Sequence, residues 1–132
     1  MTASHILVVD SANVVGSVPD GWWRDRRGAT ERLRDHLGTL DTSGALGVSG
    51  GRIILVAEGA ARGVMPVPGV EVVEAPGEGD DTIVDVVRAL LDADPASRPS
   101  VTVATADREL RRRVEALGAR VTSPRGVRHR RA

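Results

Sequence analysis

Acidic side chains follow three separate apolar stretches of this chain, and they are its main candidates for chemistry. Asp10 comes directly after the first stretch, with the amide of Asn13 three residues later. The pair Asp80-Asp81 opens a segment with helical spacing, and Asp107 follows a further apolar stretch. Carboxylate and amide oxygens are the ligands that hard divalent cations such as Mg²⁺ and Mn²⁺ prefer. The pattern therefore predicts a metal site.

A divalent cation in such a site would allow hydrolysis without a nucleophilic side chain. One or two ions can lower the pKa of a water molecule, orient it and stabilise the charge on a phosphodiester. The chain has no Cys and only three His residues. His5 precedes a predicted strand, His36 lies in a predicted helix and His129 is close to the C-terminus, so structural or solvated roles are favoured for all three. Metal-assisted hydrolysis is therefore the reaction that the sequence favours.

Each acidic site also has a structural explanation. Asp10 taken alone fits a turn or a helix cap, and Thr105 or Asp107 fits the cap of the helix that follows them. One member of the pair Asp80-Asp81 can cap its helix and interact favourably with the helix dipole. These explanations do not account for the recurrence of acids at the carboxyl ends of strands.

Two further acids lie close to these sites. Asp81 and Asp85 share a helix face at i, i+4 spacing, where like charges are mildly destabilising without a cation. We take Asp80 as the main metal ligand of this segment, Asp81 as a second ligand and Asp85 as an additional acid. Glu109 falls in the first turn of the helix after Asp107, where a negative charge is favourable.

The elements that must position these residues alternate between strand and helix. Apolar runs predict strands at residues 5–9, 52–57, 70–74, 101–104 and 120–122, and helical spacing predicts helices at 22–40, 80–93 and 107–117. Such alternation implies right-handed crossovers and an α/β fold of three layers, α/β/α, around a mostly parallel sheet of four to five strands. Ligands of these sheets bind beyond the carboxyl ends of the strands.

Length and composition predict one domain in residues 1–124, followed by a basic, flexible tail in residues 125–132. The chain has 132 residues, of which 41% are hydrophobic and 27% are charged. No apolar run is long enough to span a membrane, and the first residues lack the charged start of a signal peptide, so we expect a cytoplasmic protein. The formal net charge is zero, so bulk charge does not favour nucleic-acid binding.

Other α/β proteins with acidic sites are excluded by single residues. A haloacid-dehalogenase-like phosphatase needs a second Asp two residues after the first, where this chain has Ala12. A response-regulator receiver and a Walker P-loop each need a Lys, and all 18 basic residues of this chain are Arg.

Three motifs together resemble the NYN branch of the PIN-like nuclease superfamily. They are VVDSANVV at residues 8–15, GDDTIV at residues 79–84 and VATADREL at residues 103–110, in the order and spacing of the family. The resemblance covers nearly the whole chain. It implies a PIN-like parallel sheet flanked by helices and a ribonuclease-like site that depends on Mg²⁺ or Mn²⁺.

The resemblance also implies roles for individual residues. Asp10, Asp80 and Asp107 would hold the metal, and Asn13 and Thr105 would orient ligands or water. Glu109 occupies the place of a further acid of the family. Ser11 departs from the Gly that is commoner after the first Asp, and it adds a hydroxyl behind the metal ligands.

Aromatic and basic residues near the first motif are candidates for RNA binding. Trp22, Trp23, Arg24 and Arg27 fall close together, and Trp and Arg can stack on bases and grip the phosphates of single-stranded RNA. Arg108, beside the third motif, is a further candidate. The alternative is that one Trp packs into the core while the charged residues form a solvated helix face.

The sequence thus favours a metal-dependent ribonuclease that hydrolyses phosphodiester bonds of RNA, with single-stranded RNA as the expected partner and no membrane. Two alternatives remain open at this point. One is a non-catalytic RNA-binding module that keeps the acidic pocket, and the other is an interaction subunit regulated by a protein partner. A homodimer is compatible with the sequence, which carries no feature that proves it.

Overall fold

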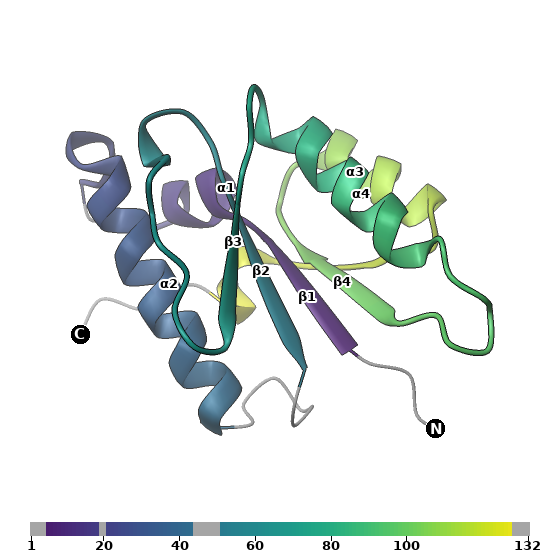
Figure 1. Ribbon diagram of the computed structural model, residues 1–132. Coiled ribbons are helices and arrows are strands. Elements are labelled where there is room, and N and C mark those ends of the chain that lie inside the picture. Colours follow the sequence, from purple (N-terminus) through teal and green to yellow (C-terminus); the bar gives the residue numbers. More distant parts are fainter. Residues whose placement is uncertain (1–4, 19–20, 44–50, 128–132) are drawn as a thin grey trace.

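The computed structural model describes residues 5–18, 21–43 and 51–127, apart from the side chains at positions 22, 40–43 and 60 (Figure 1). Its centre is a five-stranded sheet of β1 His5–Asp10, β2 Arg52–Ala57, β3 Val70–Glu74, β4 Ser100–Ala104 and β5 Arg120–Thr122. The strand order is β3-β2-β1-β4-β5, and every neighbouring pair is parallel. The α/β architecture and the mostly parallel sheet predicted from the sequence are confirmed.

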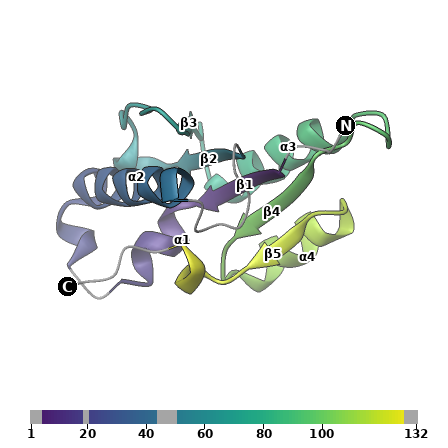
Figure 2. The same ribbon diagram turned by 90° about the horizontal axis from the view of Figure 1, so that it is seen from below.

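Helices cover both faces of the sheet. They are α1 Ser11–Gly16, α2 Arg26–Ser43, α3 Gly79–Leu91 and α4 Arg108–Ala116, and short 3₁₀ turns occur at η1 Trp22–Arg24, η2 Gly59–Ala61 and η3 Pro124–Gly126. Helices α1 and α2 pack on one face, and α3 and α4 pack on the other (Figures 1 and 2). These are the three layers expected.

Alternate residues of the central strands face opposite layers. Ile6 and Val8 of β1 pack under α3 and α4, whereas Leu7 and Val9 pack against α1 and α2. Successive side chains of a strand point to opposite faces, so a strand buried on both sides is apolar throughout. This explains why β1 is a continuous apolar run rather than an alternating one.

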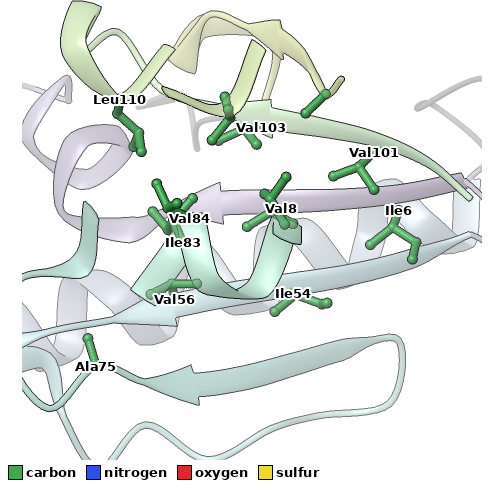
Figure 3. Packing of buried hydrophobic residues seen from close by; sticks show 13 residues of the cluster. Ile6, Val8, Ile54, Val56, Ala75, Ile83, Val84, Val101, Val103 and Leu110 are labelled. Carbon is green, nitrogen blue, oxygen red and sulfur yellow. The ribbon is translucent and has the colours of Figure 1, made fainter. Parts of the chain in front are cut away.

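The packing of α3 and α4 fixes where their first turns lie. Figure 3 shows Ile83 of α3, Leu110 of α4 and Val8 of β1 in one core cluster, and all three side chains are fully buried. Asp80 and Asp107 each precede one of these anchors by three residues. Burial of the two anchors therefore holds both acidic residues at the carboxyl edge of the sheet.

The first helices differ from the prediction. The segment 22–40, predicted as one helix, is divided into the turn η1 and the longer helix α2, which begins at Arg26. Helix α1 was not predicted. It begins directly after β1, where Asp10 caps it by accepting a hydrogen bond from the Asn13 main-chain N–H.

The packed domain continues beyond residue 124. Arg125 belongs to the turn η3, and Val127 is 2% exposed and packs with the core cluster on the α1 and α2 side. The expected boundary of the basic tail therefore lies at least three residues later, and residues 128–132 fall outside the described residues. Within the described part of the chain, no helix has the length and apolar character needed to cross a membrane.

Candidate active site at the carboxyl edge of the sheet

Asp10 is the most buried carboxylate of the candidate site. It ends β1, and its residue is 5% exposed. One carboxylate oxygen accepts a hydrogen bond from the Asn13 main-chain N–H at 3.4 Å, and the other accepts one from the Thr105 hydroxyl at 2.9 Å. Burial raises the pKa of Asp10 to about 6, although both hydrogen bonds act to lower it, and the charges of Asp80 and Glu58 raise it further.

Thr105 and Asn13 join the first and third motifs. The buried Thr105 hydroxyl, which donates to Asp10, also accepts a hydrogen bond from the Asp107 main-chain N–H at 3.2 Å. The Asn13 side-chain oxygen accepts a hydrogen bond from the Ala106 main-chain N–H at 2.8 Å. Both side chains therefore hold the loop between β4 and α4 against the end of β1. The role in orienting ligands or water that the resemblance implies for these two residues stays a prediction.

Asp80 lies in the first turn of α3, close to other carboxylates. Burial raises its pKa, and the negative charges of Asp107, Glu58 and Glu78 raise it further, while Arg113 opposes the change. Asp107 caps α4, because its side chain accepts a hydrogen bond from the Leu110 main-chain N–H at 2.9 Å. The structure thus brings the acids of the three sequence motifs into one electrostatic neighbourhood.

Glu58 is an acid of this neighbourhood that the sequence analysis did not identify as a site residue. It follows β2, is half-buried, and accepts a hydrogen bond from the main-chain N–H of Gly79 at the start of α3. Its charge raises the pKa values of both Asp10 and Asp80. The signal that identifies it is the one used for Asp10, namely an acid directly after an apolar strand. We refer to Asp10, Glu58, Asp80 and Asp107 as the acidic cluster.

Three other predicted acids lie at the surface. Asp81 forms an ion pair with Arg113 at 3.1 Å, and Asp85 forms one with Arg88 at 3.5 Å. Glu109 is exposed in the first turn of α4. None of the three is among the charges that shift the pKa of Asp10 or of Asp80. Of the pair Asp80-Asp81, Asp80 is therefore the member that belongs to the acidic cluster.

Four of the five candidate RNA-binding residues, Trp23, Arg24, Arg27 and Arg108, are on the surface. Trp23 is 58% exposed, and the Arg24 guanidinium lies over its ring at 5.9 Å from the centroid. Arg27 donates a hydrogen bond to the Gly63 carbonyl at 3.1 Å, so it braces a loop. Arg108 is exposed on α4. The side chain of Trp22 lies outside the part of the chain that the structure describes.

The acidic cluster has the chemistry of a hard-cation site. Its ligands would be carboxylate oxygens, and a bound cation would offset the burial and the repulsion that raise the pKa values of Asp10 and Asp80. Among the described residues, however, no three His, Cys, Asp or Glu side chains are already arranged to hold a metal ion. The donors suit Mg²⁺ or Mn²⁺, and an ion would have to draw them together.

The fold is similar to that of Rae1 (YacP) from Bacillus subtilis. A crystal structure of that protein matches with a TM-score of 0.73 and 22% identity, over 92% of this chain and 70% of that chain. A tryptophan-to-leucine mutant of it matches with a TM-score of 0.69 and 23% identity, over 93% of this chain and 72% of that chain. No family model matches this chain, and no curated protein matches its sequence. The likeness shows that this chain shares its fold with that protein.

Proposed function

We propose that this protein is a ribonuclease of the NYN type that requires Mg²⁺ or Mn²⁺ and hydrolyses phosphodiester bonds of single-stranded RNA. The observation that carries this proposal is the acidic cluster. Its members come from four separate segments, and the burial and mutual repulsion of two of them raise their pKa values. Such a concentration of unpaired negative charge is costly unless a cation or a proton compensates it.

The residues that would hold the metal are Asp10, Asp80 and Asp107, with Glu58 as a further ligand. When bound, the ion would activate a water molecule and stabilise the charge that develops on the phosphodiester. Thr105 would keep the Asp10 carboxylate oriented, because it donates to one of the two carboxylate oxygens. Asn13 would keep the following loop in place through its bond to Ala106.

The exposed side chains near η1 would bind the RNA strand. An exposed indole offers a face on which any base can stack, and the guanidinium of Arg24 already lies over the ring of Trp23. Arg108 at the start of α4 would attract phosphates near Asp107. The RNA strand would then run from the Trp23 surface across the acidic cluster.

A non-catalytic RNA-binding module is the second candidate. The observation in its favour is that no metal-binding group is assembled among the described residues. In this case the acidic cluster would hold no metal, and the RNA would be held by the arginine and tryptophan side chains alone.

Cleavage of labelled single-stranded RNA separates the two candidates. The wild-type chain would be incubated with Mn²⁺ or Mg²⁺, beside an EDTA control and the variants Asp10→Asn and Asp94→Asn. Asp94 is an exposed acid beyond α3, so its variant controls for the loss of one charge. We expect cleavage that requires metal and falls about 10²–10³-fold in Asp10→Asn only, as when one electrostatic stabiliser is removed. RNA binding without cleavage by any of the proteins would support the second candidate.

A further inference from the structure

A cavity opens beside the acidic cluster and shares Glu58 with it. Its volume is about 440 Å³, and its walls come from α1, α2, η2 and the loop before α3. This volume lies in the range of pockets that bind small organic groups. Ala12, Val15 and Ala61 give it an apolar surface. Ser11 and Glu58 also line it, so the cavity adjoins the acidic cluster through a neighbour of Asp10 and through Glu58 itself.

Ser11 supplies a buried polar group that lacks a partner. Its residue is 1% exposed, and its hydroxyl is the buried side-chain group without a hydrogen bond in the described part of the chain. Buried hydroxyls are nearly always hydrogen-bonded, because an unsatisfied one loses its interaction with water without compensation. Ser11 lines the cavity, so a small rotation of its side chain would offer this unpartnered hydroxyl to a ligand.

The charged groups of the cavity are carboxylates and guanidinium groups, and the hydroxyl of Thr30, which also lines it, donates to the Arg26 carbonyl at 2.8 Å. Glu78 is exposed in the loop before α3, and Glu58 already accepts a hydrogen bond from Gly79. Arg62 is held by its bond to the Pro76 carbonyl at 2.9 Å, and Arg26 contributes a second positive charge from α2. The cavity therefore combines an apolar surface with hydrogen-bond acceptors from two carboxylates and hydrogen-bond donors from two guanidinium groups.

We propose that this cavity binds one guanine base of the RNA strand whose phosphodiester lies at the acidic cluster; this inference rests on the proposed function. The two oxygens of a carboxylate match the adjacent N–H donors on the Watson–Crick edge of guanine. A guanidinium matches the O6 and N7 acceptors on its other edge. The apolar surface of the cavity receives the face of the base, as protein sites for unstacked RNA bases do. Glu78, Arg62 and the Ser11 hydroxyl are the groups that would select the base.

The test is an NMR titration of the full chain with GMP, AMP, CMP and UMP in the presence of EDTA. We expect GMP to shift the amide resonances of Ser11, Gly59 and Gly77, which line the cavity. Its affinity should exceed that of each other nucleotide by about fivefold or more, the value of one or two selective hydrogen bonds. The absence of shifts with GMP, or equal affinity for all four nucleotides, would overturn the proposal.

Variants separate recognition from folding. Ser11→Ala should weaken GMP binding about three- to tenfold without lowering the melting temperature, because the hydroxyl it removes has no partner. Glu78→Gln should also weaken GMP binding, whereas Glu115→Gln, an exposed acid of α4 outside the cavity, should not. A lower melting temperature with unchanged GMP affinity in Ser11→Ala would mean that the hydroxyl is structural, and it would refute the proposal.

Cleavage mapping distinguishes an RNA base from a free nucleotide. RNAs that carry a single guanosine at different positions should be cut at a constant distance from it. Cleavage that ignores the guanosine, together with GMP binding, would make the cavity a site for free nucleotides and would contradict the proposal. The titration uses neither metal nor cleavage. A protein that cleaves no RNA but still binds GMP selectively would therefore contradict the proposed function and leave the cavity assignment intact.

Discussion

The pKa of Asp10 predicts an unusual dependence of stability on pH. In the metal-free protein, burial raises this pKa from 3.8 to about 6. One pKa unit corresponds to about 1.4 kcal/mol, so the ionised form costs the folded state about 3 kcal/mol at neutral pH. The folded state holds the Asp10 proton more tightly than the unfolded chain does. The contribution of Asp10 to the free energy of unfolding therefore falls as the pH rises from about 4 to 6.

The variant Asp10→Asn removes this dependence. The amide keeps one acceptor oxygen, so it retains one of the hydrogen bonds from Asn13 and Thr105 and loses the other, at a cost of about 1 kcal/mol. At pH 7 the variant should be about 2 kcal/mol more stable than the wild type, because it avoids the buried charge. Near pH 3.5, where Asp10 is mostly protonated in both states, it should be about 1 kcal/mol less stable. The order of stability should therefore reverse between these pH values.

Urea unfolding in the presence of EDTA, followed by far-UV circular dichroism from pH 3.5 to 7.5, measures this reversal. With an m value of 1–3 kcal/mol/M for a small protein, the difference at pH 7 amounts to about 1 M in the urea midpoint. Asp94→Asn is the control, since Asp94 is exposed and should show no reversal. If Asp10→Asn were less stable than the wild type by the same amount at every pH, the buried carboxylate would not be the cause and the argument would fail.

Three further predictions concern other parts of the site. In EDTA, Thr105→Val should raise the pKa of Asp10 above about 6, because the hydrogen bond from Thr105 acts to lower it. A pH titration that follows the Asp10 carboxylate carbon by NMR measures this pKa, and an unchanged value would contradict the prediction. Addition of Mn²⁺ at pH 7 should raise the melting temperature of the wild type in proportion to the logarithm of the free ion concentration, and that of Asp80→Asn far less. Equal stabilisation of both proteins would show that Asp80 is not a metal ligand. Trp23→Ala should weaken single-stranded RNA binding by about 1–3 kcal/mol in a fluorescence anisotropy titration. The melting temperature should not change, since Trp23 is 58% exposed, and a lower melting temperature with unchanged RNA binding would mean that Trp23 is a structural residue.

The sheet and the main acidic residues could be predicted from the sequence because both depend on local patterns. Strands buried on both faces are continuous apolar runs, and parallel strands bring their carboxyl ends to one edge of the sheet. The positions of Asp10 and Asp107 relative to β1 and β4 follow from these two facts. The position of Asp80 follows from the helical spacing of apolar residues in α3. This spacing places Ile83 in the core and hence Asp80, three residues earlier, at the carboxyl edge of the sheet.

The features that were not predicted depend on contacts between distant segments. Helix α1 contains two adjacent β-branched residues, Val14 and Val15, which favour extended structure locally, and it forms because both pack into the core. Glu58 directly follows an apolar strand, as Asp10 does, but its bond to Gly79, twenty-one positions later in the chain, is visible only in the structure. The unpartnered hydroxyl of Ser11 depends on the packing of surrounding elements. A sequence pattern shows none of these contacts.

The structural and the functional explanations of Asp10 turn out to be compatible. As the sequence suggested, Asp10 acts as a cap, and this role explains its hydrogen bond to Asn13. A cap does not require a buried charge, since Ser or Asn makes the same bond without the cost of desolvating a carboxylate. Here the hydrogen bonds lower the pKa of Asp10, and burial with neighbouring acids still raises it to about 6. The excess cost is what a bound cation would remove, so the capped and rigidly held carboxylate favours a metal site over a purely structural one.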